Sequence, residues 1–302
     1  MVGPVGWPRN TRQGMAQRLA VSYDSVMAIA VRPNQFAHEL RRWRSSRRWS
    51  QLELALRART TQRHLSFMEQ GRSAPGRTMV VRLAETLELS LRERNALLLA
   101  AGYAPLFPES GVDDDALRPV REALDGVLAG HMPYPAVIVR PYGEVVAAND
   151  ALDVLAEGAA DWLLEPPVNV LRLAVHPAGM GPRVENLGEW GRHIIDSLRA
   201  QLLRSPDPRL DEFVAELEGY VPGATPGPDH LGFAVPLQLR DGDGEVRLIT
   251  TLTSFATATD VALAELVLEA FLPADDDSAA ILERAQRNRT HRDELLTGLG
   301  SW

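Results

Sequence analysis

The stretch from Trp49 to Gly71 reads WSQLELALRARTTQRHLSFMEQG, and its spacing predicts two short helices joined by a tight turn. Ser50 and Glu53 form a capping-box pattern that begins the first helix, and Thr61 can cap the second. Gly71 suits the left-handed conformation that often ends a helix. The stretch therefore predicts a helix-turn-helix.

Apolar residues at helical spacing indicate which face of each helix points inward. We expect Leu52, Ala55 and Leu56 of the first helix to face a core, together with Leu65 and Met68 of the second. The opposite side of the second helix is polar. A plain helical hairpin would show the same stripes, so this pattern alone does not establish a function.

The outward face of the second helix carries residue types that read DNA. Glutamine and arginine side chains match the adenine and guanine edges in the major groove, which makes Gln62 and Arg63 candidate base contacts. Gln51 lies at a helix start, where a phosphate is readily accepted. The full set of candidate DNA contacts is Arg48, Gln51, Thr61, Gln62, Arg63, Ser66, Phe67 and Arg72.

The flanking sequence completes a small helical domain. Phe36, Leu40 and Trp43 form a helical stripe before the motif, and Ser90 with Glu93 is a second capping box after it. Further arginines near the motif are phosphate candidates, or simply a solvated basic face: Arg41, Arg42, Arg44 and Arg47. We expect five helices between residues 33 and 105.

Charge separates the chain into a basic and an acidic part. Residues 33–105 contain 13 arginines and 6 acidic residues, whereas residues 106–302 contain 15 arginines and 33 acidic residues. Counterion release favours duplex binding by the first part, and phosphate repels the second. The chain has no cysteine and no apolar run near the length that spans a bilayer. We expect a cytoplasmic protein with no membrane segment.

The helix-turn-helix resembles that of the XRE (Cro/repressor-like) family. More narrowly, RHLSFMEQGRSAPGRTMVVRLAETLELSLRERNALLLAAGYAP, residues 63–105, is similar to the MmyB-like transcription regulators of actinobacteria. The wider family carries glycine and then an aliphatic residue in the turn, whereas this chain has Arg59 and Thr60. The resemblance implies a five-helix, lambda repressor-like DNA-binding domain.

The second half of the chain has a mixed pattern. Strands are indicated at residues 136–140, 144–148, 233–239, 245–255 and 265–271, and helices at residues 187–203 and 210–217. Asn149 is expected to cap a helix after the first hairpin, and Asp241 to Gly244 form a hairpin turn. With helices on one face of an antiparallel sheet, this domain is expected to be α+β. Its opening order, a strand hairpin and then a helix, is that of a PAS-type sensor, so we expect a PAS-like domain.

The NVLRL core of residues 169–173 resembles a motif of the MmyB-like ligand-binding domain, which implies a small hydrophobic ligand such as a fatty acid. Arg172 or His176 could bind its carboxylate. The expected apolar wall is Trp162, Leu171, Trp190, Ile194, Phe233, Leu252 and Phe255, although each of these residues could equally fill a core.

These observations lead to one preferred function and two alternatives. We expect a DNA-binding regulator, acting as a homodimer, that senses a hydrophobic ligand and needs no other cofactor or metal. The second domain could instead only dimerise or bind a protein. An enzyme is disfavoured, because no catalytic motif is present. The expected segments are an extension (1–32), the DNA-binding domain (33–105), the sensor (106–275) and a tail (276–302).

Overall fold

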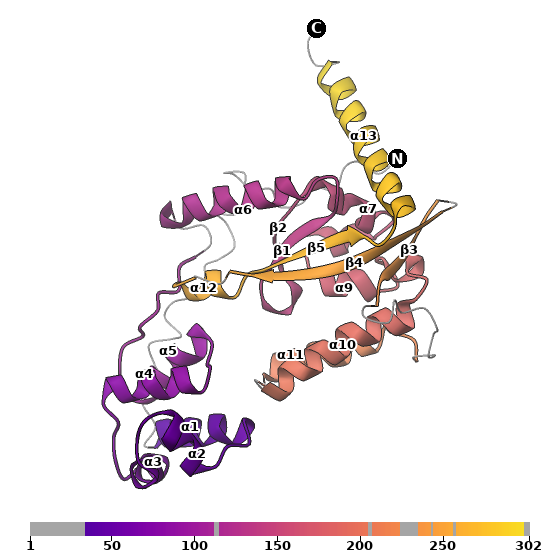
Figure 1. The fold of residues 1–302 in the computed structure, drawn as a ribbon. Coiled ribbons are helices and arrows are strands. Elements are labelled where there is room, and N and C mark those ends of the chain that lie inside the picture. Colours follow the sequence, from indigo (N-terminus) through magenta and orange to yellow (C-terminus); the bar gives the residue numbers. More distant parts are fainter. Residues whose placement is uncertain are drawn as a thin grey trace. The chain divides into compact units, whose positions relative to one another are not determined.

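A computed structural model of the protein describes residues 34–111, 115–204, 207–223, 235–242, 244–255 and 258–298. These residues form two compact units (Figure 1). The helical unit comprises residues 34–111 and 258–264. The sheet unit comprises the described residues of 115–255 and 265–298. No helix in these ranges is long and apolar enough to cross a bilayer.

The helical unit contains the five helices expected from the sequence. They are α1 (Gln35–Ser46), α2 (Gln51–Arg57), α3 (Gln62–Glu69), α4 (Arg77–Thr86) and α5 (Leu91–Ala100). Phe36, Leu40 and Trp43 of α1 are buried in its core, as their spacing predicts. The capping box at Ser90 and Glu93 is complete, whereas Ser50 accepts only the backbone N–H of Glu53.

The prediction for the inner face of α2 was wrong in part. Leu52 is 50% exposed and Leu56 68% exposed, whereas Leu54 and Ala55 are buried. A helix of two turns with apolar residues on both sides does not fix its own orientation, so packing against the neighbouring helices decides which side is buried. The prediction for Leu65 and Met68 of α3 is confirmed, since both are fully buried.

The helical unit extends past residue 105 and includes a segment from far along the chain. Asn95 binds the backbone of residues 106 and 107 through three hydrogen bonds. Helix α12 (Val261–Ala264) belongs to the same unit. The backbone N–H of Val261 donates to the carbonyl of Pro108 at 2.8 Å, and the buried Asp260 carboxylate accepts from the N–H of Ser110 at 2.9 Å.

The sheet unit is built on one antiparallel sheet of five strands in the order β2-β1-β5-β4-β3. The strands are β1 (Ala136–Val139), β2 (Val145–Ala148), β3 (Leu237–Asp241), β4 (Gly244–Ser254) and β5 (Val267–Pro273). The hairpin turn at Asp241 is confirmed by its pairing with Gly244. Strand β5 begins two residues later than predicted. The start of the predicted run at residue 233 lies outside the described residues.

Helices and short 3₁₀ turns surround this sheet. They are η2 (Asp115–Leu117), α6 (Arg118–Gly130), η3 (Pro141–Gly143), η4 (Asp150–Leu152), α7 (Asp153–Ala156), α8 (Asp161–Leu164), α9 (Val170–Val175), η5 (Gly181–Arg183), α10 (Leu187–Arg204), α11 (Pro208–Glu218) and α13 (Asp276–Gly298). Figure 1 shows α10 and α11 on one side of the sheet and α6 on the other. The α+β prediction is confirmed, whereas the expectation that helices cover only one face of the sheet is wrong, because α6 lies on the other face.

One local prediction for this unit was wrong. Asn149 precedes η4 but makes no capping bond; its side chain accepts from the N–H of Ala136 and donates to the carbonyls of Leu128 and Tyr134. The segment expected to be a tail begins with helix α13, whose Leu282 is buried in the core of the sheet unit.

Candidate functional site

The turn between α2 and α3 has the geometry that the DNA-binding motif needs. Thr61 caps α3 by accepting the N–H of His64 at 3.1 Å. Arg59 has a φ of 51°, the left-handed conformation that the wider family gives to glycine. Gly71 has a φ of 69°, and a Cβ atom there would lie 2.0 Å from the Asn34 side chain. The departure at Arg59 therefore keeps the shape of the turn.

A buried ion pair fixes α3 against α1 and α2. The Glu69 carboxylate is fully buried and accepts two hydrogen bonds from Arg44, at 2.6 and 2.9 Å. Gln51 donates to the same carboxylate at 2.8 Å. The bond to Glu69 raises the pKa of Arg44. Because its donors come from two helices, this cluster sets the orientation of α3.

The candidate base-reading residues lie on the open side of α3. Gln62 and Arg63 are exposed, and the Arg63 guanidinium lies 5.3 Å from the ring centre of Phe67. Ser66 accepts a hydrogen bond from Gln70 at 2.9 Å. Arg48 and Arg72 are exposed beside the motif. Among the predicted phosphate contacts, Gln51 and Arg44 already bind Glu69, so their side chains are less available than those of Arg48 and Arg72.

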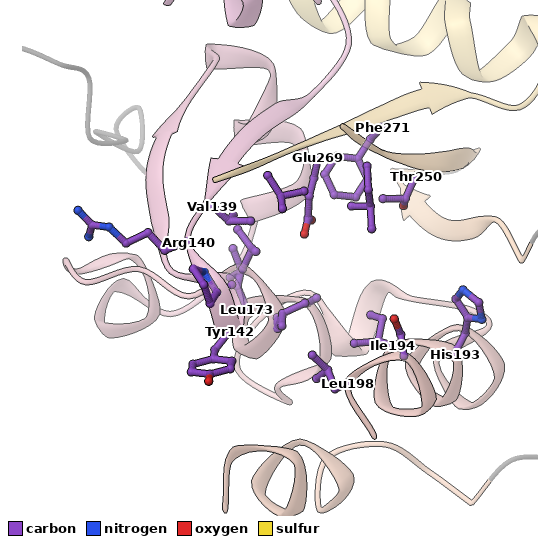
Figure 2. A pocket seen from close by; sticks show the side chains of 18 of the residues that line it. Val139, Arg140, Tyr142, Leu173, His193, Ile194, Leu198, Thr250, Glu269 and Phe271 are labelled. Atoms are coloured by element: carbon purple, nitrogen blue, oxygen red, sulfur yellow. The ribbon is translucent and has the colours of Figure 1, made fainter. Parts of the chain in front are cut away.

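The sheet unit contains a cavity of about 380 Å³ between the sheet and helices α9 and α10. Alternate residues of a strand share one face, and three neighbouring strands supply the sheet side: Val139 from β1, Thr250 and Leu252 from β4, and Val267, Glu269 and Phe271 from β5. Helix α10 supplies two rows of side chains. The apolar row is Trp190, Ile194 and Leu198, and the polar row is His193, Ser197 and Gln201. Figure 2 shows this arrangement.

The turn after β1 closes one end of the cavity. Tyr142 donates its hydroxyl to Asp207 at 2.6 Å, and burial together with this bond raises its pKa to about 12. Gly143 has a φ of 81°, and a Cβ atom there would lie 2.7 Å from Leu171, which also lines the cavity. The glycine thus lets the turn approach the cavity wall.

On the sheet side of the cavity, two polar side chains of β4 and β5 have no protein partner among the described residues. The Thr250 hydroxyl oxygen is buried without a hydrogen bond. Glu269 makes no hydrogen bond or ion pair and points into the cavity (Figure 2). Burial raises the pKa of Glu269 to about 7. No group of three metal-binding side chains occurs in the described part of the chain.

Similarity to known families agrees with both sites. Residues 120–285 match the MmyB-like transcription regulator ligand binding domain, and residues 35–97 match a helix-turn-helix domain. The first match covers more than half of the chain. The chain belongs to the MmyB-like transcription regulators. It is therefore a DNA-binding transcription regulator with a ligand-binding domain, and this family is not one of enzymes.

Solved structures give only partial matches to this MmyB-like regulator. An HTH_3 family transcriptional regulator from Vibrio cholerae is 27% identical over 22% of this chain, with a TM-score of 0.20, and this chain spans only 36% of its length. The clp gene regulator ClgR from Corynebacterium glutamicum is 23% identical over 33% of this chain and 94% of its own, with a TM-score of 0.21. No curated protein matches.

The structure brings together only part of the predicted ligand site of this regulator. Leu171, Trp190, Ile194 and Leu252 line the cavity. Trp162 is 54% exposed and outside the lining, Phe255 is not in the lining either, and Phe233 lies outside the described residues.

The two predicted carboxylate anchors are also absent from the cavity lining. Arg172 instead binds Glu216 through two hydrogen bonds, at 2.6 and 2.9 Å. His176 packs edge-on against Trp162 and Tyr220. Neither position supports an anchor in this cavity. Glu269 is not among the residues predicted from the sequence, although a single acidic residue inside the apolar run VLEAFLP (residues 267–273) indicates an unusual position.

Proposed function

We propose that this regulator acts as a homodimer that reads a two-fold DNA site through α3 and senses a small, mainly apolar ligand in the cavity of its sheet unit. The observation that carries the proposal is the cavity itself, which lies within the family's ligand-binding domain and is walled by large apolar side chains from β5, α9 and α10. Its volume is within the usual range for sites that bind small molecules.

The ligand is fatty-acid-like in its apolar part. Leu252 lines the cavity and is 66% exposed, so the cavity reaches the surface beside it and an extended chain can enter there. Each methylene that becomes buried contributes about 0.8 kcal/mol. The lining does not favour a carboxylate head group. Arg140, the one arginine among the described lining residues, is already paired with Glu144.

The small size of the reading surface supports the proposal of a homodimer. Helix α3 has 8 residues, and one such helix contacts too few base pairs to select a site. Two copies related by a two-fold axis would read a palindromic site. We also propose a cytoplasmic location, because the protein must reach its DNA partner, which lies in the cytoplasm of a bacterial cell.

The chain-length dependence of binding tests the ligand proposal. Calorimetric titration with saturated fatty acids and alcohols of increasing length is expected to show affinity that rises with each methylene and falls once the cavity is full. Ile194→Trp places a larger side chain in the cavity and should abolish binding. Leu203→Trp, on the same helix at an 81% exposed position, is the matched control. Equal binding by both variants, or affinity independent of chain length, would contradict the proposal.

A further inference from the structure

The two unpartnered polar groups on the sheet side of the cavity lie on adjacent strands and face the same space. Glu269 of β5 is paired across the sheet with Leu252 of β4, and Thr250 lies two residues before Leu252 on the same face. Figure 2 shows both side chains among apolar neighbours such as Phe271. A polar group that is removed from water without a partner costs free energy, so both groups favour a ligand that supplies hydrogen-bond donors.

The charges around the cavity favour a ligand whose hydrogen-bond donor is positively charged. An ionised carboxylate among apolar side chains is stabilised most by a nearby positive charge. The acidic residues of positions 106–302 outnumber the arginines by 33 to 15, so the potential around the sheet unit attracts cations and repels anions. Trp190 and Phe271 also line the cavity, and aromatic faces attract cations.

We propose that the ligand of this cavity carries a protonated amine on an apolar body, and that the amine donates hydrogen bonds to the Glu269 carboxylate and to the Thr250 hydroxyl oxygen. This inference rests on the proposed function, because it names the chemical class of the ligand in the same cavity. It replaces the carboxylate head group expected from the sequence, since a ligand carboxylate would lie beside Glu269 and would repel it.

The bound amine is expected to make binding depend on pH. Burial holds the pKa of Glu269 near 7, so most copies of the free protein carry a neutral Glu269 at pH 6 and an ionised one at pH 8. The other charged or titratable groups that face the cavity are Arg140, Tyr142, His193 and Glu265. Affinity for an alkylamine should rise about tenfold from pH 6 to pH 8, whereas affinity for the alcohol of equal length should change little.

A head-group series with one chain length tests the proposal on the full-length protein. Dodecylamine, dodecanol and dodecanoate are titrated calorimetrically at pH 8, below their micelle-forming concentrations. We expect dodecylamine to bind at least about tenfold more tightly than either of the others. Glu269→Gln should remove this preference and leave the affinity for dodecanol unchanged. Thr250→Val should weaken dodecylamine binding by less than Glu269→Gln does.

Glu245→Gln is the matched control, because it removes one acid from an exposed position of β4 outside the cavity. It should keep the amine preference, which separates a contact inside the cavity from general attraction to an acidic domain. Tighter binding of dodecanoate, or an amine preference that persists in Glu269→Gln, would overturn the inference while the apolar sensor stands. Failure of all three compounds to bind would overturn both proposals.

Discussion

Replacing Glu269 with glutamine should stabilise the sheet unit, with a gain that begins above pH 4.5 and is complete above pH 7. Burial raises the pKa of Glu269 from its ordinary value of 4.5 to about 7, so the folded protein holds a proton that the unfolded chain releases between these values. The free energy of unfolding therefore falls as pH rises through this window. The full cost, about 3 kcal/mol, is present above pH 7. Glutamine is neutral throughout and has nearly the same shape.

Hydrogen exchange measured by mass spectrometry gives the free energy of opening for the sheet unit alone. In peptides from β4 and β5, Glu269→Gln should exceed the wild type by about 2 to 3 kcal/mol at pH 8 and should equal it at pH 4. Comparing the proteins at the same pH cancels the intrinsic exchange rates. Glu245→Gln should show no such difference. A variant that is less stable than the wild type at pH 8, or equally stabilised at every pH, would refute the reasoning.

Four further outcomes are expected. Arg63→Ala should reduce discrimination between a selected site and random duplex by about 1 to 3 kcal/mol, whereas Arg72→Ala should weaken both equally; titrations against both DNAs decide this. Arg44→Ala leaves the fully buried Glu69 with only the Gln51 hydrogen bond and the longer 4.0 Å ion pair to Arg41, so hydrogen exchange in α1 and α3 should show a loss of up to about 3 to 5 kcal/mol. Sedimentation should detect a dimer, and a protein that stays monomeric on palindromic DNA would contradict this. Asp260→Ala removes the acceptor of the Ser110 N–H and should make DNA affinity less sensitive to ligand, as anisotropy titrations with and without ligand would show.

Local signals in the sequence were sufficient for the helical unit. Helix starts at Ser50, Thr61 and Ser90 depend on side chains only three residues from the groups they cap, so the sequence alone indicates them. The orientation of α2 could not be predicted in the same way. Leu52 and Leu54 point to different sides of a two-turn helix, and packing within the helical core, including contacts with α3, buries the side of Leu54.

The cavity depends on contacts between segments that are distant in sequence. The sequence predicts Leu171, Trp190 and Leu252 as wall residues because they are large and apolar. They meet because β4 pairs with β5 and α10 lies across the sheet. Trp162 is also a large apolar residue, but it lies outside the cavity lining. Predicting that Glu269 faces the cavity also requires the pairing register of β5, since a shift of one residue would turn its side chain to the opposite face of the sheet.

The connection between β4 and β5 offers a physical route between the two functions. Thr250 and Glu269 lie on these strands, and the segment between the strands includes α12, which belongs to the helical unit. Within the helical unit, this segment is hydrogen-bonded to residues 108 and 110. If the proposed ligand changes the spacing or rigidity of β4 and β5, we expect the change to reach this segment through the chain. Coupling of this kind is a difference in ligand affinity between DNA-bound and free protein.

The most direct test is the DNA affinity of the full-length protein with and without ligand. A duplex selected from random sequences is titrated by fluorescence anisotropy, at constant salt, in the presence of whichever dodecyl compound binds most tightly. The Kd for DNA should change at least about fivefold in the wild type and in Leu203→Trp, and should not change in Ile194→Trp. An unchanged Kd in the wild type, at ligand concentrations shown by calorimetry to fill the cavity, would contradict the claim that this cavity controls DNA binding.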